Sequence, residues 1–259
     1  MIKNKFPALL PGEKIETKKE GKFYRKINAI GYCELVITKD HLKHFPHFNL
    51  EKVKEVFDVY QERYLELMKK PFVKYISIFH NHGKEAGASQ PHPHSQIITT
   101  PLIDVDLKRA LLKSEEFFKK RGKCIYCQMN KWEKKTKKRI VFENKNFTAL
   151  CPFASKRAFQ TIISPKKHLS NFEKIEEKEK WDLAEAFLVV MKKIYKALND
   201  PPYNFYLHTT PADGKKYHFY HWHWTILPKI SIPAGFELGT RMEICVVEPE
   251  KAASYLREQ

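Results

Sequence analysis

Five residues, His92-Pro93-His94-Ser95-Gln96, carry the most information in this sequence of 259 residues. Successive side chains of a β-strand point to opposite faces, so His92, His94 and Gln96 are expected to share one face. Two imidazoles and a carboxamide on one face can bind a metal ion, attack phosphorus or hold an oxyanion. The apolar residues Ile97-Ile98 that follow place the segment in a core. The pattern predicts phosphate-ester chemistry beside a buried strand.

A loop rich in small residues precedes this strand. It reads Asn81-His82-Gly83-Lys84-Glu85-Ala86-Gly87-Ala88-Ser89, and its glycines allow the backbone to approach a ligand closely. The positive charge of Lys84 suits an anionic group. The loop and the strand together indicate a site for phosphate groups.

The H-x-H stretch belongs to a longer pattern that occurs twice, because the chain contains an internal repeat. Two apolar strand-like segments each end in a histidine, His41 in the first half and His168 in the second. A long amphipathic helix follows in each half, over residues 50–68 and 181–198, with apolar residues at helical spacing. Each half continues with a strand, a polar loop and an H-x-H strand, which is His221-Trp222-His223 in the second half.

Two copies of this strand–helix–strand unit predict an α+β fold, with a mainly antiparallel sheet and helices packed on it. No Gly/Ser-rich linker separates the copies, so we expect two pseudo-repeats in one continuous domain. We assign residues 1–104 to the first repeat, 105–121 to a connecting helix and 122–259 to the second repeat.

A four-ligand metal site is predicted in the second repeat. Cys124-Ile125-Tyr126-Cys127 supplies two thiolates, and His168 and His221 supply two imidazoles, which is a tetrahedral S2N2 set that favours zinc. His223 is a competing fourth ligand because it shares a strand face with His221. The alternatives are a redox pair, or two buried cysteines beside ordinary histidines.

The first repeat keeps His41 and His92 without cysteine partners. Asn4-Lys5-Phe6-Pro7-Ala8-Leu9 resembles Lys145-Asn146-Phe147-Thr148-Ala149-Leu150, and this alignment places a matching C-x-x-C before Met1. The first repeat therefore holds no metal, binds one weakly, or belongs to a chain that has lost a longer N-terminus.

Composition limits the partners. The net charge is +17, but lysines alternate with glutamates over residues 173–180, as on a solvated helix face, and an anionic substrate explains a positive field equally well. A nucleic-acid partner is therefore not expected. The apolar runs are too short to span a membrane, and five cysteines, an odd number, suit a reducing compartment, so we expect a cytoplasmic protein.

The chain resembles the galactose-1-phosphate uridylyltransferase family of the histidine-triad (HIT) superfamily, including its ADP-sugar phosphorylase relatives. The resemblance covers nearly the whole chain. It is carried by Phe79 to Gln96, by Asn4 to Leu9, by His221 to His223, and by Ala234 to Gly239 with Pro249-Glu250 behind it.

This resemblance implies a duplicated HIT-like fold, a homodimer, and an NDP-sugar and a sugar 1-phosphate as substrates. It implies that His94 is the nucleophile, assisted by Gln96, and that His92 is a metal ligand. It also implies a set of substrate contacts: Asn4, Asn81, Gly87, Ala88, Ser89, Ser95, Gln96 and Phe236.

The expected reaction is transfer of a nucleoside monophosphate through a covalent nucleotidyl-histidine, with UDP-glucose and a hexose 1-phosphate as the leading pair. Lys5 after Asn4, and Thr240-Arg241 after Gly239, depart from uridylyltransferases and leave base preference open. One alternative is an ADP-sugar or dinucleotide phosphorylase or hydrolase of the same superfamily. The other, motivated by the incomplete first half, is a catalytically silent nucleotide- or metal-binding protein.

Overall fold

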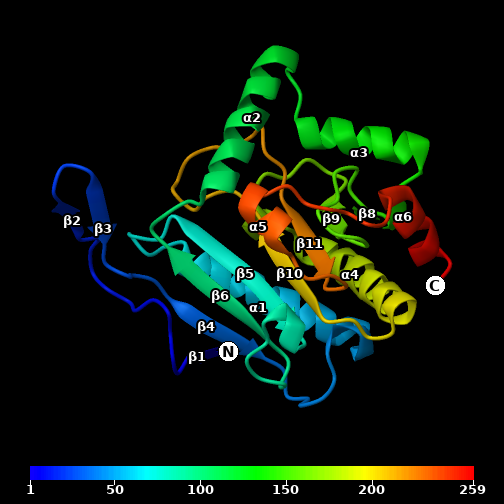
Figure 1. Cartoon of the computed structure of the whole chain (residues 1–259), viewed down its shortest axis with the longest axis horizontal. Coiled ribbons are helices and arrows are strands. Elements are labelled where there is room, and N and C mark those ends of the chain that lie inside the picture. The colour runs from blue at the N-terminus through cyan, green and yellow to red at the C-terminus, as the bar shows by residue number, and fades with distance from the viewer.

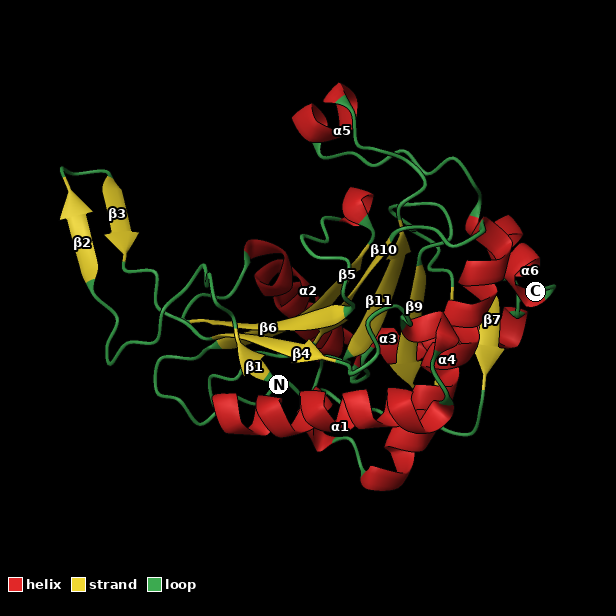
Figure 2. Cartoon of the chain, turned by 90° about the horizontal axis from the view of Figure 1, so that it is seen from below, coloured by secondary structure: helices red, strands yellow, loops and turns green.

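A nine-stranded antiparallel sheet forms the centre of the computed structural model, which describes residues 1–259 (Figure 1). Its strands lie in the order β1-β4-β6-β5-β10-β11-β9-β8-β7. In that order they are Ile2–Lys3, Cys33–Ile37, His94–Thr100, Tyr75–His82, Tyr203–His208, His223–Pro228, Thr161–Pro165, Phe147–Leu150 and Ile140–Glu143. A separate hairpin of β2 (Thr17–Glu20) and β3 (Tyr24–Ile27) projects from the body of the molecule (Figure 2).

Two long helices, α1 (Leu50–Leu67) and α4 (Glu177–Leu198), cover one face of the sheet and pack on each other (Figure 2). Asn49 caps α1 by accepting a hydrogen bond from the Lys52 backbone N–H at 2.9 Å, as expected for an Asn N-cap. The shorter helices are α2 (Val105–Arg121), α3 (Ile125–Thr136), α5 (Gly235–Thr240) and α6 (Pro249–Arg257), with single 3-10 turns at Phe45–His47, Lys84–Ala86 and Phe172–Lys174.

The sheet is built twice. The order β1-β4-β6-β5 of the first repeat corresponds to the order β8-β9-β11-β10 of the second, and β7 lies outside this correspondence at the far edge. The registers agree, because Val36 pairs with Ser95 in the first repeat and Ile163 pairs with Trp224 in the second. The repeats meet where β5 pairs with β10, so that their inner strands form one continuous ladder. The predicted α+β fold with a duplicated antiparallel sheet is confirmed.

Three local expectations were wrong. Asn81 and His82 belong to β5 and not to a loop, because β10 continues to pair with them as far as Tyr203 opposite His82. The strand β6 begins at His94 and leaves His92 outside, since Pro93 between them has no N–H for the ladder. Trp181 was expected in the core, but it is 41% exposed at the start of α4.

The alignment of Asn4 with Asn146 was also wrong. Ile2 pairs with Leu35 in the first repeat, and the equivalent pair in the second repeat is Leu150 with Ile162. Asn4 therefore follows its strand, whereas Asn146 precedes β8. The two segments were aligned because their sequences are similar, and no alternating buried pattern fixed their register. The sheet shows that the aligned residues occupy different positions.

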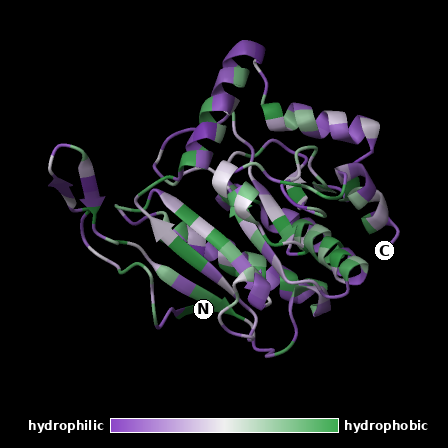
Figure 3. Cartoon of the chain, viewed as in Figure 1, coloured by the Kyte–Doolittle hydropathy of each residue, from purple (hydrophilic) through white to green (hydrophobic).

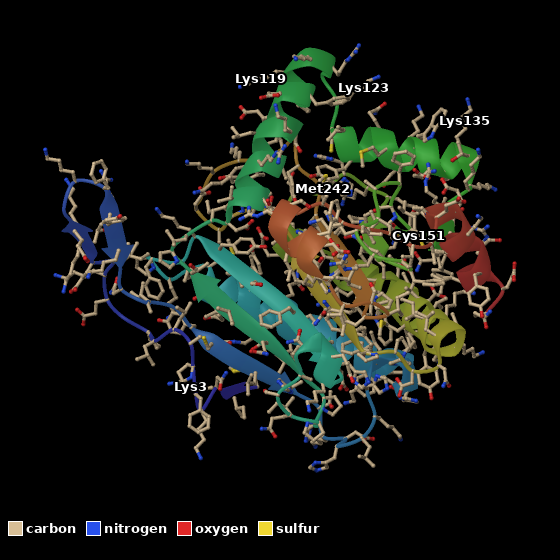
Figure 4. The ribbon with its side chains drawn as sticks, viewed as in Figure 1. Lys3, Lys119, Lys123, Lys135, Cys151 and Met242 are labelled. Carbon is tan, nitrogen blue, oxygen red and sulfur yellow. The ribbon has the colours of Figure 1, made fainter.

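Polar and charged residues are spread around the molecule. Apolar residues concentrate along α4 and alternate with polar ones along the central strands (Figure 3). The exposed lysines Lys119, Lys123 and Lys135 lie along α2, α3 and the turn between them, and Lys3 lies on the opposite side of the molecule (Figure 4). No helix is both long and apolar enough to cross a membrane.

Candidate functional site

His94, the first residue of β6, is half-buried, and it faces away from α1 because its neighbour Ser95 contacts Tyr60 of that helix. Its Nδ1 is 2.9 Å from the backbone oxygen of His92. When Nδ1–H donates to that carbonyl, the tautomer is fixed and the lone pair of Nε2 is available to an electrophile. This is the orientation that a nucleophilic histidine at this position would need.

Ser95 points the other way. It is 3% exposed, and its hydroxyl hydrogen-bonds the Tyr60 hydroxyl and lies 3.1 Å from His80 Nδ1. Burial holds the pKa of His80 well below its ordinary value, so this network is uncharged beneath the strand. Any contact between Ser95 and substrate must therefore come from its backbone; the side chain anchors the strand that presents His94.

The loop after β5 is shaped by two glycines. Gly83 has φ +82°, and a Cβ there would lie 2.8 Å from Pro202 Cβ, so no other residue fits. Gly87 has a left-handed φ of +84°. The backbone N–H groups of Ala86, Gly87 and Ala88 all donate to carbonyls inside the loop. These three N–H groups are therefore occupied within the loop, and a phosphate would meet other groups there, such as the Asn81 amide.

Asn204 on β10 orients Asn81. Its Nδ2 donates to Asn81 Oδ1 at 2.8 Å and to the Ala86 carbonyl at 2.8 Å. Because Asn81 Oδ1 is occupied as an acceptor, the Asn81 NH2 group is left to face the ligand side. A residue of the second repeat thus holds the loop of the first.

A cavity of about 560 Å³ opens beside this loop. Its wall is formed by Asn81, His82, Gly83, Lys84, Ala88, Ser89, Gln90, Pro91 and Pro93. The wall reaches Pro93, the neighbour of His94, but not His94 itself. The cavity is therefore large enough for a phosphorylated sugar beside Pro93 and His94, with few apolar residues in its wall.

The other residues expected to contact the substrate are Gln96, Asn4 and Phe236, and they lie in different parts of the fold. Gln96 lies on the same face of β6 as His94, with partial exposure. Asn4 lies two strands away, after β1, where its Oδ1 accepts from the Phe6 N–H at 3.0 Å. Phe236 is half-exposed on α5, which stands off the open face of the sheet (Figure 2). Their roles stay predictions.

The second repeat gathers four metal-ligand side chains, Cys124, Cys127, His168 and His221, with one ligand atom of each within 4.8 Å of all the others. Cys127 Sγ lies 3.3 Å from His168 Nδ1 and 3.4 Å from His221 Nδ1. In a tetrahedral zinc site, ordinary bond lengths give a sulfur–nitrogen edge of about 3.5 Å. The donor set and its spacing fit a closed four-coordinate site.

The outer contacts of this cluster also fit a metal. His168 Nε2 lies 2.8 Å from the His218 carbonyl, and His221 Nε2 lies 2.9 Å from the Pro165 carbonyl. These bonds turn both Nδ1 lone pairs toward the sulfurs. The hydrogen bond from Cys127, aided by both imidazoles, lowers the pKa of the Cys124 thiol, which keeps a thiolate in the cluster.

His223 lies outside this cluster. Its Nδ1 is 3.4 Å from the His221 carbonyl, and its ring packs on His208 with centroids 4.7 Å apart. The structure thus favours His221 over His223 as the fourth member of the group.

In the first repeat, His41 and His92 lie with ring centroids 4.6 Å apart, and His92 Nε2 is 2.9 Å from the Thr38 carbonyl. The two histidines form half of the same arrangement.

Sequence reasoning missed Asn204 and the carbonyls of Thr38 and Pro165. Backbone carbonyls have no sequence signal. Asn204 lies in a strand that the pattern predicted, but its pairing across the repeat boundary with Asn81 depends on the register of β10 on β5. Nothing local in the sequence specifies that register.

Two family models match the chain. The galactose-1-phosphate uridyl transferase N-terminal domain matches residues 1–103, and the C-terminal domain of the same family matches residues 111–234. An ADP-glucose phosphorylase of Arabidopsis thaliana is 32% identical over 100% of this chain and 73% of its own length. A galactose-1-phosphate uridylyltransferase of Thermotoga maritima is 32% identical over 99% of this chain and 83% of its own length.

Solved structures agree with these matches. An Arabidopsis thaliana ADP-glucose phosphorylase with bound ADP-glucose superposes with a TM-score of 0.89 at 29% identity, covering 100% of this chain and 81% of that one. A uridylyltransferase structure gives a TM-score of 0.90 at 28% identity, covering 99% and 84%. The chain belongs to the galactose-1-phosphate uridylyltransferase family.

Proposed function

We propose that this protein transfers a nucleoside monophosphate from a nucleoside diphosphate sugar to a phosphate acceptor through a covalent nucleotidyl-His94. The observation that carries the proposal is the 2.9 Å contact of His94 Nδ1 with the His92 carbonyl, beside the loop cavity. That contact leaves Nε2 as the nucleophilic atom. A protein that only binds nucleotides, without reacting with them, does not need a histidine whose tautomer is fixed in this way.

The proposed reaction has two displacements. Nε2 of His94 attacks the α-phosphorus, a nitrogen–phosphorus bond forms, and the bond from the α-phosphorus to the bridging oxygen breaks, which releases the sugar 1-phosphate. A phosphate oxygen of the acceptor then attacks the same phosphorus and the nitrogen–phosphorus bond breaks. The His92 carbonyl holds the Nδ1 proton throughout, and Gln96 and the Asn81 amide face the charge on the non-bridging oxygens.

The first candidate for the substrates is UDP-glucose with a hexose 1-phosphate. It is supported by both family models and by the similarity to the Thermotoga maritima enzyme. The second candidate is an ADP-sugar with inorganic phosphate as acceptor, supported by the equal identity to the Arabidopsis thaliana phosphorylase and by Lys5 after Asn4. Both use the same covalent step.

A matrix of donors and acceptors tests the proposal. UDP-glucose and ADP-glucose are each incubated with galactose 1-phosphate, inorganic phosphate or water, and the nucleotide products are separated. The transferase predicts a new NDP-sugar with galactose 1-phosphate and no net breakdown without acceptor. Breakdown that requires phosphate selects the phosphorylase, breakdown in water selects a hydrolase, and binding without turnover in every cell of the matrix contradicts the proposal.

We propose that Cys124, Cys127, His168 and His221 hold one structural zinc ion. Zinc would tie the start of α3 to β9 and to the residues before β11, and all four protein ligands leave no open position for substrate. Elemental analysis of the purified protein tests this: about one zinc per chain is expected, and its absence from Cys124→Ser assigns it to the cluster.

We propose that the protein works as a homodimer in the cytoplasm. The segment from Ile230 to Val246 supports a partner surface because most of its large apolar residues are exposed, up to 85% at Ile232. All five cysteines are free, which suits a reducing compartment. Light scattering during gel filtration measures the mass in solution, and a mass of one chain contradicts the dimer.

A further inference from the structure

A second group of metal-ligand side chains lies away from the cysteines. His44 precedes the turn Phe45–His47, His82 ends β5, and Asp200 lies between α4 and β10. Their ligand atoms lie within 4.8 Å of one another. The Asp200 Oδ1 atom is 3.3 Å from His44 Nε2 and 3.7 Å from His82 Nε2.

We propose that His44, His82 and Asp200 form a binding site for one divalent transition-metal ion of the zinc and cobalt class. Two imidazole nitrogens and one carboxylate oxygen are the donors that such borderline ions accept, and three protein ligands leave at least one position for water. The site joins both repeats, because His44 and His82 come from the first and Asp200 from the second.

The second layer of contacts prepares His44 as a ligand. Its Nδ1 lies 3.2 Å from the Tyr203 hydroxyl. When Nδ1–H donates to that oxygen, the Nε2 lone pair faces Asp200, as the outer hydrogen bond of a metal-bound histidine requires. Burial, with the neighbouring His82 and His47 rings, lowers the pKa of His44 to about 3, and burial also lowers the pKa of His82. Both imidazoles are therefore neutral at pH 7.

The exposure of the group leaves a route for an ion. The His44 side chain is 4% exposed, whereas His82 and Asp200 are 23% and 46% exposed. The ion would enter from the Asp200 side and keep water there. Asp200 follows Asn199, and both have left-handed φ values, +57° and +53°, which turn the chain sharply at the end of α4.

The rings of His44 and His82 lie stacked, with centroids 3.7 Å apart and planes 9° from parallel. Stacked rings direct their lone pairs side by side, so binding requires one ring to rotate until both lone pairs converge. His82 is the freer of the two because it is more exposed. This movement of His82 is itself a measurable consequence of the proposal.

Cobalt titration of the full-length, zinc-loaded protein tests the site. Co²⁺ should bind with one equivalent and weak visible bands, without the thiolate charge-transfer band that a cysteine site produces. His82→Gln and Asp200→Asn should each weaken binding at least about tenfold, because loss of an outer-shell partner alone costs about 10- to 100-fold in metal affinity. His41→Gln is the matched control: it removes an exposed histidine beside His92, and should leave the titration unchanged.

A second readout does not depend on the variants folding. Paramagnetic Co²⁺ should broaden the imidazole NMR signals of His44 and His82 in the unmodified protein before those of His41 and His92. Absence of saturable binding at millimolar Co²⁺ overturns the proposal. So does binding that survives in both His82→Gln and Asp200→Asn, or binding that His41→Gln abolishes, since the ion would then lie at the half-arrangement of the first repeat.

Discussion

The two repeats place a histidine at the same point of the same strand, but the surroundings of the two rings differ. Nδ1 of His94 lies 2.9 Å from the His92 carbonyl, and Nδ1 of His223 lies 3.4 Å from the His221 carbonyl. Pro93, next to His94, lines the loop cavity, whereas His223 packs against His208 and Tyr126, whose ring centroid is 6.0 Å away. Both histidines are partly exposed, so the repeats differ in what surrounds the histidine and not in its burial class.

The metal-ligand group is complete in the second repeat and incomplete in the first. The second repeat has two cysteines and two histidines in contact, while the first keeps only His41 and His92. His92 and His221 occupy equivalent positions, and the Nε2–H of each can donate to an equivalent carbonyl, that of Thr38 or of Pro165. The first repeat thus combines the loop cavity with an incomplete metal-ligand group, and the second combines a histidine packed among aromatic rings with a complete group.

The largest effect is expected at His94. His94→Asn removes the proposed nucleophile, so turnover should fall at least about 10⁴-fold, as for other lost nucleophiles. The mirrored change His223→Asn should leave kcat within about tenfold, because that ring packs against His208 and Tyr126, away from the loop cavity. Steady-state rates measure both, with thermal melting to show that each variant is folded. Equal losses in the two variants would refute the division between the repeats.

The next effect concerns the complete metal group. Cys127→Ser should remove the ion and destabilise the protein by about 3 kcal/mol or more, because structural zinc binding is coupled to folding. For a chain of this size that corresponds to a fall in Tm of roughly 6–12 °C. Cys245→Ser, which changes a free cysteine elsewhere, should alter neither metal content nor Tm. An unchanged metal content in Cys127→Ser would rule out the cluster as the binding site.

A smaller effect is expected where the second repeat supports the first. Asn204→Ala breaks two hydrogen bonds, to Asn81 and to Ala86, and frees the Asn81 amide to rotate. We expect kcat/KM to fall about 10- to 100-fold, equivalent to about 1–3 kcal/mol for buried groups left unpaired. Asn171→Ala, which loses a 2.7 Å bond to Thr210 away from the loop, should leave kcat/KM near the wild-type value. If both variants behave alike, Asn204 acts only on general stability.

The smallest effect concerns pH. Burial lowers the pKa of His208 to about 4, so the unfolded chain binds a proton near pH 6.5 that the folded protein accepts only near pH 4. Folding stability should therefore decrease as pH falls from about 6.5 to 4, by on the order of 2 kcal/mol from this residue. Urea unfolding at pH 7 and pH 4.5 measures this loss. It should be smaller in His208→Gln, and an identical loss in the two proteins would show that His208 is not the covered group we describe.

Much of the fold could be predicted from sequence because its signals are local. The long helices follow from apolar spacing and the Asn49 cap, and the strands at Cys33 and Tyr203 follow from short apolar runs between turns. The β2–β3 hairpin and α3 were not foreseen. The hairpin is mostly polar and its residues are exposed along nearly its full length, so it has no alternating apolar pattern to reveal it.

The candidate site could be predicted in part. His94 and the cysteine–histidine group were found because their residue types and spacing are rare, and the structure brings the four ligands together. The resemblance made Ser95 a substrate contact, although strand alternation already places its side chain on the face opposite His94 and Gln96, where the structure has it. Asn204 meets Asn81 only through the pairing of β5 with β10. Asp200 meets His44 and His82 only through the turn after α4. Contacts between distant segments are set by tertiary packing, and no local pattern encodes them.

The central claim, that His94 of the first repeat carries the nucleotide, is tested most directly by trapping the intermediate. The protein is mixed with UDP-glucose or ADP-glucose without acceptor, quenched, digested under conditions that preserve phosphorus–nitrogen bonds, and mapped by mass spectrometry. We predict a nucleoside monophosphate on the peptide that contains His94, removed when acceptor is added before quenching. A nucleotide on His223, or turnover with no adduct on any histidine, would contradict the account.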